Sequence, residues 1–210
     1  MFRCVLALDE VWDPQNFGSL LRTGQFFGLD QVVVCAKNSA PLGPTVSKAS
    51  AGAMEVMIPS LHSTNNLMKF LDDSKANGWQ VVGTSSADLR DKYAPEPTSL
   101  YEMFTTPQEM VHMEEDRMAG LEALGEGAEI VMMRRGFDHN KPCILVLGNE
   151  GFGLRTNILR RCDLLVHIPR LAADPTSTEN TRCSVDSLNV GVAGGIIMQH
   201  LLNRPKNVHE

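Results

Sequence analysis

Three features are missing from this sequence, and each absence excludes a class of protein. No stretch of its 210 residues approaches the roughly 18 to 20 uninterrupted apolar residues that cross a bilayer, so we expect a soluble protein. Its five cysteines lie far apart, without a Cys-x-x-Cys pair or a neighbouring histidine pattern. This spacing indicates neither a zinc site nor a disulfide framework, and it favours reduced thiols in an intracellular compartment.

A dinucleotide-binding fingerprint is also missing. Gly148, Gly151 and Gly153 follow an apolar run, but their spacing does not match Gly-x-Gly-x-x-Gly. A nicotinamide-dinucleotide site is therefore poorly supported. The first residues alternate into an apolar run and lack the basic, serine-rich character of a transit peptide.

The acidic charge of the chain is concentrated in one segment. The net charge is −6, which by itself disfavours a nucleic-acid partner because phosphates are bound by Lys and Arg. Residues 85–141, however, hold 12 acidic and 6 basic residues, whereas the remainder holds 13 of each. The proline-rich start and the Met- and Glu-rich stretch of this segment predict an insertion formed by a loop and one amphipathic helix, or partial disorder.

Outside the insertion, short apolar runs alternate with segments of helical periodicity. This alternation predicts an α/β fold with a mainly parallel sheet and helices on both faces. Gly191, Gly194 and Gly195 would let the last helix pack very closely. The predicted strands are 5–8, 31–36, 56–59, 79–84, 143–148 and 164–168, and the predicted helices are 16–27, 45–54, 63–77, 155–161 and 189–202.

Three segments in the last third of the chain look like bends at the ends of buried strands. They are residues 147–153, 167–169 and 187–190, and together they indicate a ligand pocket built from strand-end loops. Each also has a plainer interpretation. The first is typical of an ordinary turn, His167 lies within a strand and is expected to be packed, and Ser187 is a candidate N-cap with no evident histidine base.

Residues 13–23 form a fourth candidate. Asp13 and Pro14 predict a turn, Asn16 stands at a candidate N-cap position, and Arg22 follows six residues later. That separation is less than two helical turns, so the two side chains need not share a face. The plainer alternative is a capped helix with a solvated arginine.

In this order and spacing, segments 13–23, 144–154 and 168–193 resemble the motifs of the SPOUT superfamily, specifically the SpoU (TrmH-like) RNA ribose 2′-O-methyltransferases. The resemblance covers nearly the whole chain apart from the insertion. Residues 41–55 look most like the mitochondrial branch that methylates a guanosine ribose in large-subunit rRNA, with the bacterial 23S rRNA enzymes as close kin.

The resemblance implies a fold and a cofactor. The C-terminal part would be threaded into a deep trefoil knot, an exception to the rule that chains avoid knots. S-adenosylmethionine would lie in the knot, held mainly by backbone groups. The implied cofactor-binding residues are Thr84, Leu147, Gly148, Asn149, Gly151, Ile168 and Leu188.

The resemblance also implies catalytic roles. Arg22 matches the arginine proposed to activate the ribose 2′-hydroxyl, although a guanidinium is a poor base and is better suited to binding the phosphate and stabilising the developing alkoxide. Asn16 would orient Arg22 or the substrate, and Glu150 would hold the knot loops or the dimer partner. Ser187 and Asn189 would shape the pocket. The RNA-contacting residues would be Arg22, Arg155, Arg160 and Arg161, and no metal would be required.

The expected partners are large-subunit rRNA and a second copy of the chain, with the surfaces near 16–27 and 190–202 partly buried in a homodimer. We expect residues 1–210 to form one catalytic domain interrupted by the 85–141 insertion, without the N-terminal RNA-binding domain of relatives. The expected compartment is the mitochondrial matrix, or the cytoplasm for a bacterial protein. Three alternatives stay open: a tRNA ribose methyltransferase of the same family, a catalytically idle homologue acting in ribosome assembly, and an unrelated small-molecule α/β enzyme.

Overall fold

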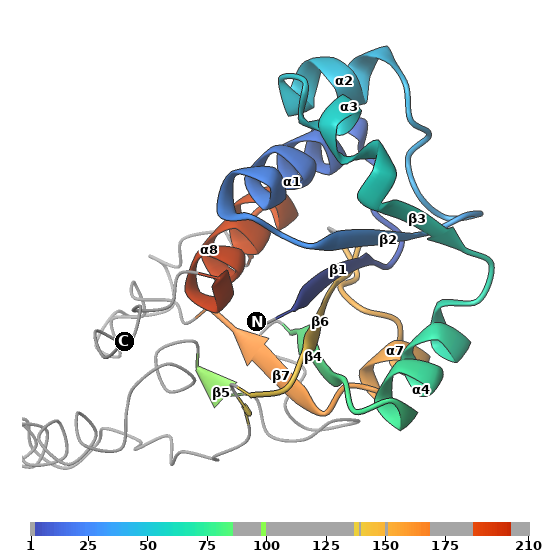
Figure 1. The fold of residues 1–210 in the computed structure, drawn as a ribbon, viewed down its shortest axis with the longest axis vertical. Coiled ribbons are helices and arrows are strands. Elements are labelled where there is room, and N and C mark those ends of the chain that lie inside the picture. The colour runs from blue at the N-terminus through green and yellow to red at the C-terminus, as the bar shows by residue number, and fades with distance from the viewer. Residues whose placement is uncertain are drawn as a thin grey trace, which may run out of the picture.

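The protein is built around one parallel sheet. A computed structural model describes residues 3–85, 98–99, 137–138, 140–149, 151–168 and 187–202. Seven strands lie in the order β3-β2-β1-β6-β4-β7-β5, and every adjacent pair is parallel (Figure 1). The predicted α/β class and parallel sheet are therefore confirmed. The strands are β1 (Cys4–Leu8), β2 (Gln31–Cys35), β3 (Leu61–Thr64), β4 (Gln80–Thr84), β5 (Thr98–Ser99), β6 (Cys143–Leu147) and β7 (Leu164–His167).

The two central strands, β1 and β6, have the burial that is typical of a parallel sheet. All five residues of β1 and all five of β6 are buried, because helices cover both faces of the sheet. The two strands pair in register from Cys4 opposite Cys143 to Leu8 opposite Leu147. Their carboxyl ends therefore finish at the same edge.

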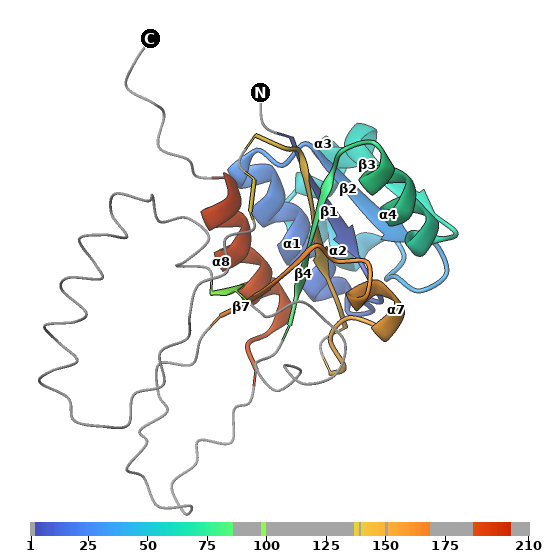
Figure 2. The same ribbon diagram turned by 90° about the horizontal axis from the view of Figure 1, so that it is seen from below.

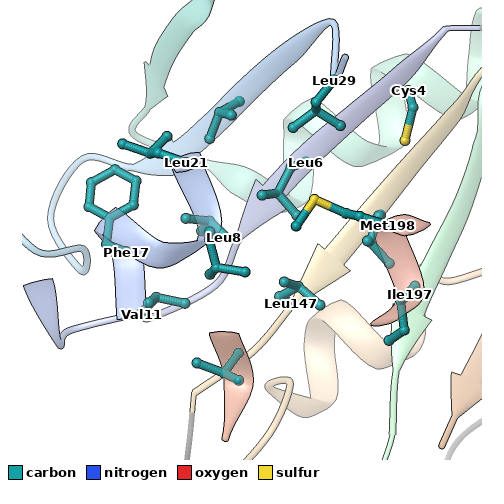
Figure 3. Close-up of a cluster of buried hydrophobic side chains, with 14 of the residues drawn as sticks. Cys4, Leu6, Leu8, Val11, Phe17, Leu21, Leu29, Leu147, Ile197 and Met198 are labelled. Atoms are coloured by element: carbon teal, nitrogen blue, oxygen red, sulfur yellow. The ribbon is translucent and has the colours of Figure 1, made fainter. Parts of the chain in front are cut away.

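Helices cover the two faces of the sheet in separate groups (Figures 1 and 2). On one face, Leu6 and Leu147 pack in a core that includes Phe17 of α1 and Met198 of α8 (Figure 3). On the other face, Val146 packs in a second core with α4 and α7. The helices are α1 (Pro14–Phe27), α2 (Pro44–Ser50), α3 (Ala53–Met57), α4 (Leu67–Ala76), α7 (Thr156–Leu159) and α8 (Val190–Leu202), with a 3₁₀ turn η1 (Ile58–Ser60).

Small residues bring α8 against α1, as the sequence predicts. A Cβ added at Gly194 would lie 2.5 Å from Leu20 Cδ2 and 2.7 Å from Leu147 Cδ1, so a side chain there has no room. At Gly191 the nearest atom of α1 would be Ser19 Oγ at 3.3 Å. Figure 2 shows the two helices side by side on one face of the sheet.

The predicted elements between residues 45 and 77 are partly wrong. Ala51 (φ 50°) and Gly52 (φ 87°) adopt left-handed backbone conformations, which end one helix and separate it from the next. Residues 56–59 therefore belong to α3 and η1, and the strand follows at β3. Helix α4 begins after Asn66, whose side chain accepts a hydrogen bond from the Lys69 N–H at 3.0 Å.

Two predictions fall largely outside the described residues. Within the 85–141 insertion the structure describes Ser85, the edge strand β5 and a few residues before β6. The sequence did not predict β5, which pairs Thr98 with Val166 of β7. The predicted amphipathic helix lies outside the described part, as do residues 169–186, so the trefoil knot stays a prediction. No described helix is long and apolar enough to cross a membrane.

Candidate functional site at the carboxyl edge of the sheet

The predicted strand-end segments meet at one edge of the sheet. After β1 the chain runs to β2 on one side, and after β6 it runs to β7 on the other. Because β1 and β6 are neighbours, the loops that leave them diverge at a topological switch point, where open α/β sheets place their ligands. Strands β6, β4 and β7 are also consecutive in the sheet, so their carboxyl ends lie together.

The loop after β1 is tied to the segment after β6 by a buried carboxylate. Asp9 is fully buried, and its Oδ1 accepts a hydrogen bond from Arg155 Nε at 2.9 Å while its Oδ2 accepts from the Arg155 backbone N–H at 3.2 Å. Hydrogen bonding to Asp9 raises the pKa of the Arg155 guanidinium. Arg155 Nη1 also lies 3.5 Å from Glu10 Oε1, so one arginine forms ion pairs with two neighbouring carboxylates.

A second set of contacts shapes the tight turn after β6. Asn149 and Gly153 form an isolated antiparallel bridge, with N–H to O distances of 2.9 and 2.8 Å. The Asn149 side chain accepts from Gly151 N–H at 2.8 Å and donates to the Glu10 carbonyl at 3.1 Å. A Cβ at Gly148 would lie 2.3 Å from the carbonyl carbon of Gly153, so this turn requires glycine there.

Some of the predicted cofactor-binding residues already use their polar groups in hydrogen bonds within the protein. Leu147 is buried, and its carbonyl accepts from the Asp9 N–H at 2.8 Å. The side-chain amide of Asn149 is engaged in the hydrogen bonds that hold the turn. Thr84, at the end of β4, is half-buried, and its Oγ1 lies 3.4 Å from the Val146 carbonyl. Ile168 is half-buried after β7, and Gly151 and Leu188 are exposed.

The segment before α8 joins the first motif directly. Asn189 Nδ2 donates to Asn16 Oδ1 at 3.0 Å, and Asn189 Oδ1 accepts from the Gly191 and Val192 N–H groups at 2.8 and 3.3 Å. Asn189 therefore caps α8, and Ser187, the residue weighed as a cap, lies exposed before it. The structure brings these two predicted residues together across 173 positions of sequence.

The predicted N-cap at Asn16 is wrong. Asp13 caps α1, accepting from the Gln15 N–H at 2.9 Å, because Pro14 has the φ of a first helical residue and no N–H of its own. Asn16 is instead buried in the first turn at 7% exposure and faces α8. Arg22 is exposed, so the structure does not join Asn16 to Arg22.

The predicted RNA-contacting arginines have different surroundings. Arg155 is held by Asp9, and Arg161 bonds to Asp72 at 3.0 Å through Nε and to the Asn157 carbonyl at 2.7 Å. These contacts favour structural roles. Arg160 is exposed like Arg22. Glu150 lies outside the described residues.

Sequence reasoning missed the residues that connect the loops. Asp9 and Glu10 follow a fully apolar strand, and that abrupt change to acidic residues is a signal that could have identified them. Glu10 also has φ 64°, an uncommon conformation for a residue with a side chain. Two exposed aromatic residues of these loops, Trp12 and Phe152, carried no periodic signal. Within the described ranges, no cluster of three or more His, Cys, Asp or Glu side chains could hold a metal ion.

The protein is therefore an α/β protein with a doubly wound parallel sheet, a class that commonly places its ligands at the carboxyl edge of the sheet. Residues 3–199 match the model of the SpoU rRNA Methylase family. The chain belongs to that family. The resemblance predicted from the sequence is thereby confirmed, while the role of each site residue stays a prediction.

Curated relatives extend the match along most of the chain. It is 37% identical over 202 residues to human rRNA methyltransferase 1, mitochondrial, covering 96% of this chain and 46% of that protein. It is 33% identical over 198 residues to the protein of the same name from Dictyostelium discoideum, covering 94% of this chain and 28% of that protein. The chain thus spans half or less of the length of these relatives.

Solved structures show the same fold. An AdoMet-bound rRNA methyltransferase from Sinorhizobium meliloti superposes with a TM-score of 0.61 at 23% identity, covering 95% of this chain and 55% of that chain. The A. aeolicus TrmH/SpoU tRNA modifying enzyme superposes with a TM-score of 0.62 at 19% identity, covering 96% of this chain and 75% of that chain.

Proposed function

We propose that this protein transfers a methyl group from S-adenosylmethionine to the 2′-hydroxyl of a ribose in RNA, in a guanosine of mitochondrial large-subunit rRNA. The observation that carries the proposal is the Asn16–Asn189 hydrogen bond within a chain of the SpoU family, because it joins the first and third motifs beside the strand ends. The names of the mitochondrial relatives support an rRNA substrate and a mitochondrial location, and within the mitochondrion we propose the matrix.

The carboxyl edge of the sheet fits the cofactor. Gly148 keeps the turn after β6 narrow, Thr84 ends the neighbouring strand β4, and Ile168 follows β7, the next strand along. Backbone groups and half-buried side chains therefore border one region. Leu188 adds an exposed apolar side chain from the segment before α8. When bound, S-adenosylmethionine supplies an electrophilic methyl group, and holding it in line with the ribose oxygen is the main task of these residues.

Arg22 is the residue that meets the ribose. It is exposed, and among the described residues it has no hydrogen bond or ion pair, so its guanidinium is available to a phosphate and to the developing 2′-alkoxide. Ser187 and Asn189 shape the same region. Asn16 positions Asn189 rather than Arg22.

RNA affinity of the chain depends on few cations. Arg22 and Arg160 are the exposed arginines of the predicted set, whereas Arg155 and Arg161 are engaged by carboxylates. We propose that a homodimer completes the binding surface through α1 and α8. Phe26 of α1 is 83% exposed and Val192 of α8 is 52% exposed, so both helices retain apolar surface beyond their mutual contact.

Three measurements test the proposal. Calorimetry with S-adenosylmethionine and with S-adenosylhomocysteine should give saturable binding, and size-exclusion chromatography should give a dimer. A map of ribose methylation in cells with and without the protein should lose one mark in mitochondrial large-subunit rRNA. Restoring the wild-type chain, but not Arg22→Ala, should restore that mark. Loss of a tRNA mark would instead assign the substrate to tRNA, and cofactor binding without any lost mark would indicate an idle homologue.

A further inference from the structure

Two aromatic side chains lie exposed on the loops that leave β1 and β6. Trp12 stands between β1 and α1 with 53% of its surface exposed, and Phe152 stands in the turn after β6 with 90% exposed. Burying such a side chain is favourable by about 1.5 to 3 kcal/mol, so a ligand that covers these exposed rings would gain binding free energy from them.

The loops carrying these rings are held in place. Phe152 belongs to the turn closed by the Asn149–Gly153 bridge, and its own N–H lies 3.3 Å from Asn149 Oδ1. Trp12 lies between buried Val11 and Asp13, the cap of α1. The backbone of each loop is therefore fixed independently of any ligand.

The two loops are also joined to each other. Asn149, at the base of the Phe152 turn, donates to the carbonyl of Glu10, two residues before Trp12. Arg155, three residues after Phe152, bonds to Asp9 and lies near Glu10. Both rings thus belong to one connected corner at the switch point, next to the strand end that carries Gly148.

The acidic side chains of this corner favour binding of uncharged RNA bases over binding of phosphate groups. Asp9, Glu10 and Asp13 are acidic, and Arg155 is already engaged by two of them. A phosphate would be repelled or would have to compete for the arginine. A base presents an uncharged π-face, and stacking on aromatic side chains is the usual way in which proteins hold unpaired RNA bases.

We propose that Trp12 and Phe152 form a stacking surface for the bases next to the methylated nucleotide. Together they would hold the RNA single-stranded and splayed at the carboxyl edge, while Arg22 of the following helix meets the ribose. This inference rests on the proposed function, because it assumes that RNA approaches this edge. It adds Trp12, which directly precedes the first motif segment, and it gives Phe152 of the second motif segment a substrate-positioning role.

Fluorescence tests the stacking without requiring turnover. Trp12 and Trp79 are the two tryptophans, and Trp79 packs against the core on the α4 face. In a Trp79→Phe variant, Trp12 is the single reporter. A short single-stranded oligoribonucleotide of mixed sequence should quench its emission, and the same oligomer with abasic riboses should quench it far less. Equal quenching by both oligomers, or none by either, would overturn the proposal.

Affinity and turnover separate this inference from the proposed function. Trp12→Ala and Phe152→Ala should each weaken oligoribonucleotide binding about tenfold and raise KM with little change in kcat, and Trp12→Phe should restore most of the loss. Ile58→Ala is the control, since it shortens a 55% exposed apolar side chain in η1, which precedes β3 and so lies at the opposite edge of the sheet. S-adenosylmethionine binding should be unchanged in all four variants.

The failures are distinguishable. Normal methyl transfer with unchanged RNA affinity in Trp12→Ala and Phe152→Ala would reject the stacking surface and leave the proposed function standing. Base-dependent quenching without cofactor binding would retain the surface and reject the methyltransferase. A shift from dimer to monomer in these variants, with unchanged RNA affinity per site, would assign the rings to a subunit contact and overturn the inference.

Discussion

The side chain of Asn189 joins Asn16 to the start of α8. Its Nδ2 donates to Asn16 Oδ1 at 3.0 Å, and its Oδ1 accepts from the N–H groups of Gly191 and Val192. The amide of Asn189, which lies within the third motif segment, thus caps the last helix and bonds to a buried residue of the first motif segment. Its polar atoms are occupied by the protein, which makes Asn189 a positioning residue in the proposed reaction.

Replacing Asn189 should separate its two contacts. Asn189→Asp keeps an acceptor for the helix N–H groups, where a negative charge is also favourable, whereas Asn189→Ala loses the cap. We expect Asn189→Ala to lower the free energy of unfolding by about 1 to 2 kcal/mol and Asn189→Asp to lower it less. Urea denaturation of both variants measures this order. Equal stability of the two would show that the capping contact contributes nothing.

Replacing two neighbouring glycines of α8 by alanine should have opposite effects on stability. Gly194→Ala would place a Cβ 2.5 Å from Leu20 Cδ2, so we expect a loss of about 1 to 3 kcal/mol of stability. Gly195→Ala meets Thr23 Cγ2 at 3.6 Å, an ordinary contact, and alanine is the better helix former. This control should be neutral or up to about 1 kcal/mol more stable. Thermal unfolding of both variants tests the packing, and a Gly194→Ala protein as stable as Gly195→Ala would contradict it.

The sequence predicted the sheet well because its central strands are continuous apolar runs, as in β1 and β6. It failed between residues 51 and 61, where the break depends on left-handed conformations at Ala51 and Gly52 and not on a change in hydrophobicity. An alanine carries no local sign of such a conformation.

At the site, the sequence identified candidate residues but did not predict the contacts that they make. The hydrogen bond between Asn16 and Asn189 was not predicted, since Asn16 was expected to orient Arg22 or the substrate. Arg155 was expected to contact RNA, and its partner Asp9 lies 146 positions away. Long-range pairs of this kind have no periodic signature, because they arise only when the sheet places β1 beside β6.

Gly148 should be indispensable to the turn after β6. Gly148→Ala forces a Cβ to within 2.3 Å of Gly153, and all three nearest atoms, from Gly153 and Leu154, are backbone atoms that cannot move aside cheaply. We expect loss of S-adenosylmethionine binding and a lower melting temperature. Gly151→Ala is the control in the same turn, since its nearest neighbour would be Asn149 Oδ1 at 3.6 Å. Calorimetry on both variants should show a large loss of affinity in the first alone.

Cys162 should make stability fall at alkaline pH. Burial raises the pKa of its thiol to about 12, and the Asp163 carboxylate adds to the effect. In the unfolded chain a cysteine titrates near pH 8.5. The folded state therefore keeps a proton that the unfolded state loses, so this contribution is fully present below about pH 8.5 and declines as the pH rises toward about 12.

The measurement is the slope of unfolding free energy against pH above about pH 9. Wild type should lose up to about 1.4 kcal/mol per pH unit more than Cys162→Ala, which has no thiol at this position. The comparison cancels the titration of all other groups. Parallel slopes for the two proteins would show that the Cys162 thiol loses its proton over the same pH range in the folded and unfolded states, which would contradict the raised pKa.

Arg22 should matter for turnover and not for folding. Its side chain is exposed on α1, and among the described residues it makes no hydrogen bond, so Arg22→Ala should keep the wild-type melting temperature. If the guanidinium stabilises the developing alkoxide, kcat should fall about 10²- to 10³-fold, and Arg22→Lys should recover only part because lysine lacks the planar fork. Gln25→Ala, an exposed change on the same helix, should leave both quantities unchanged. Full activity of Arg22→Ala on RNA that the wild type methylates would remove Arg22 from the reaction and assign the ribose contact to another residue.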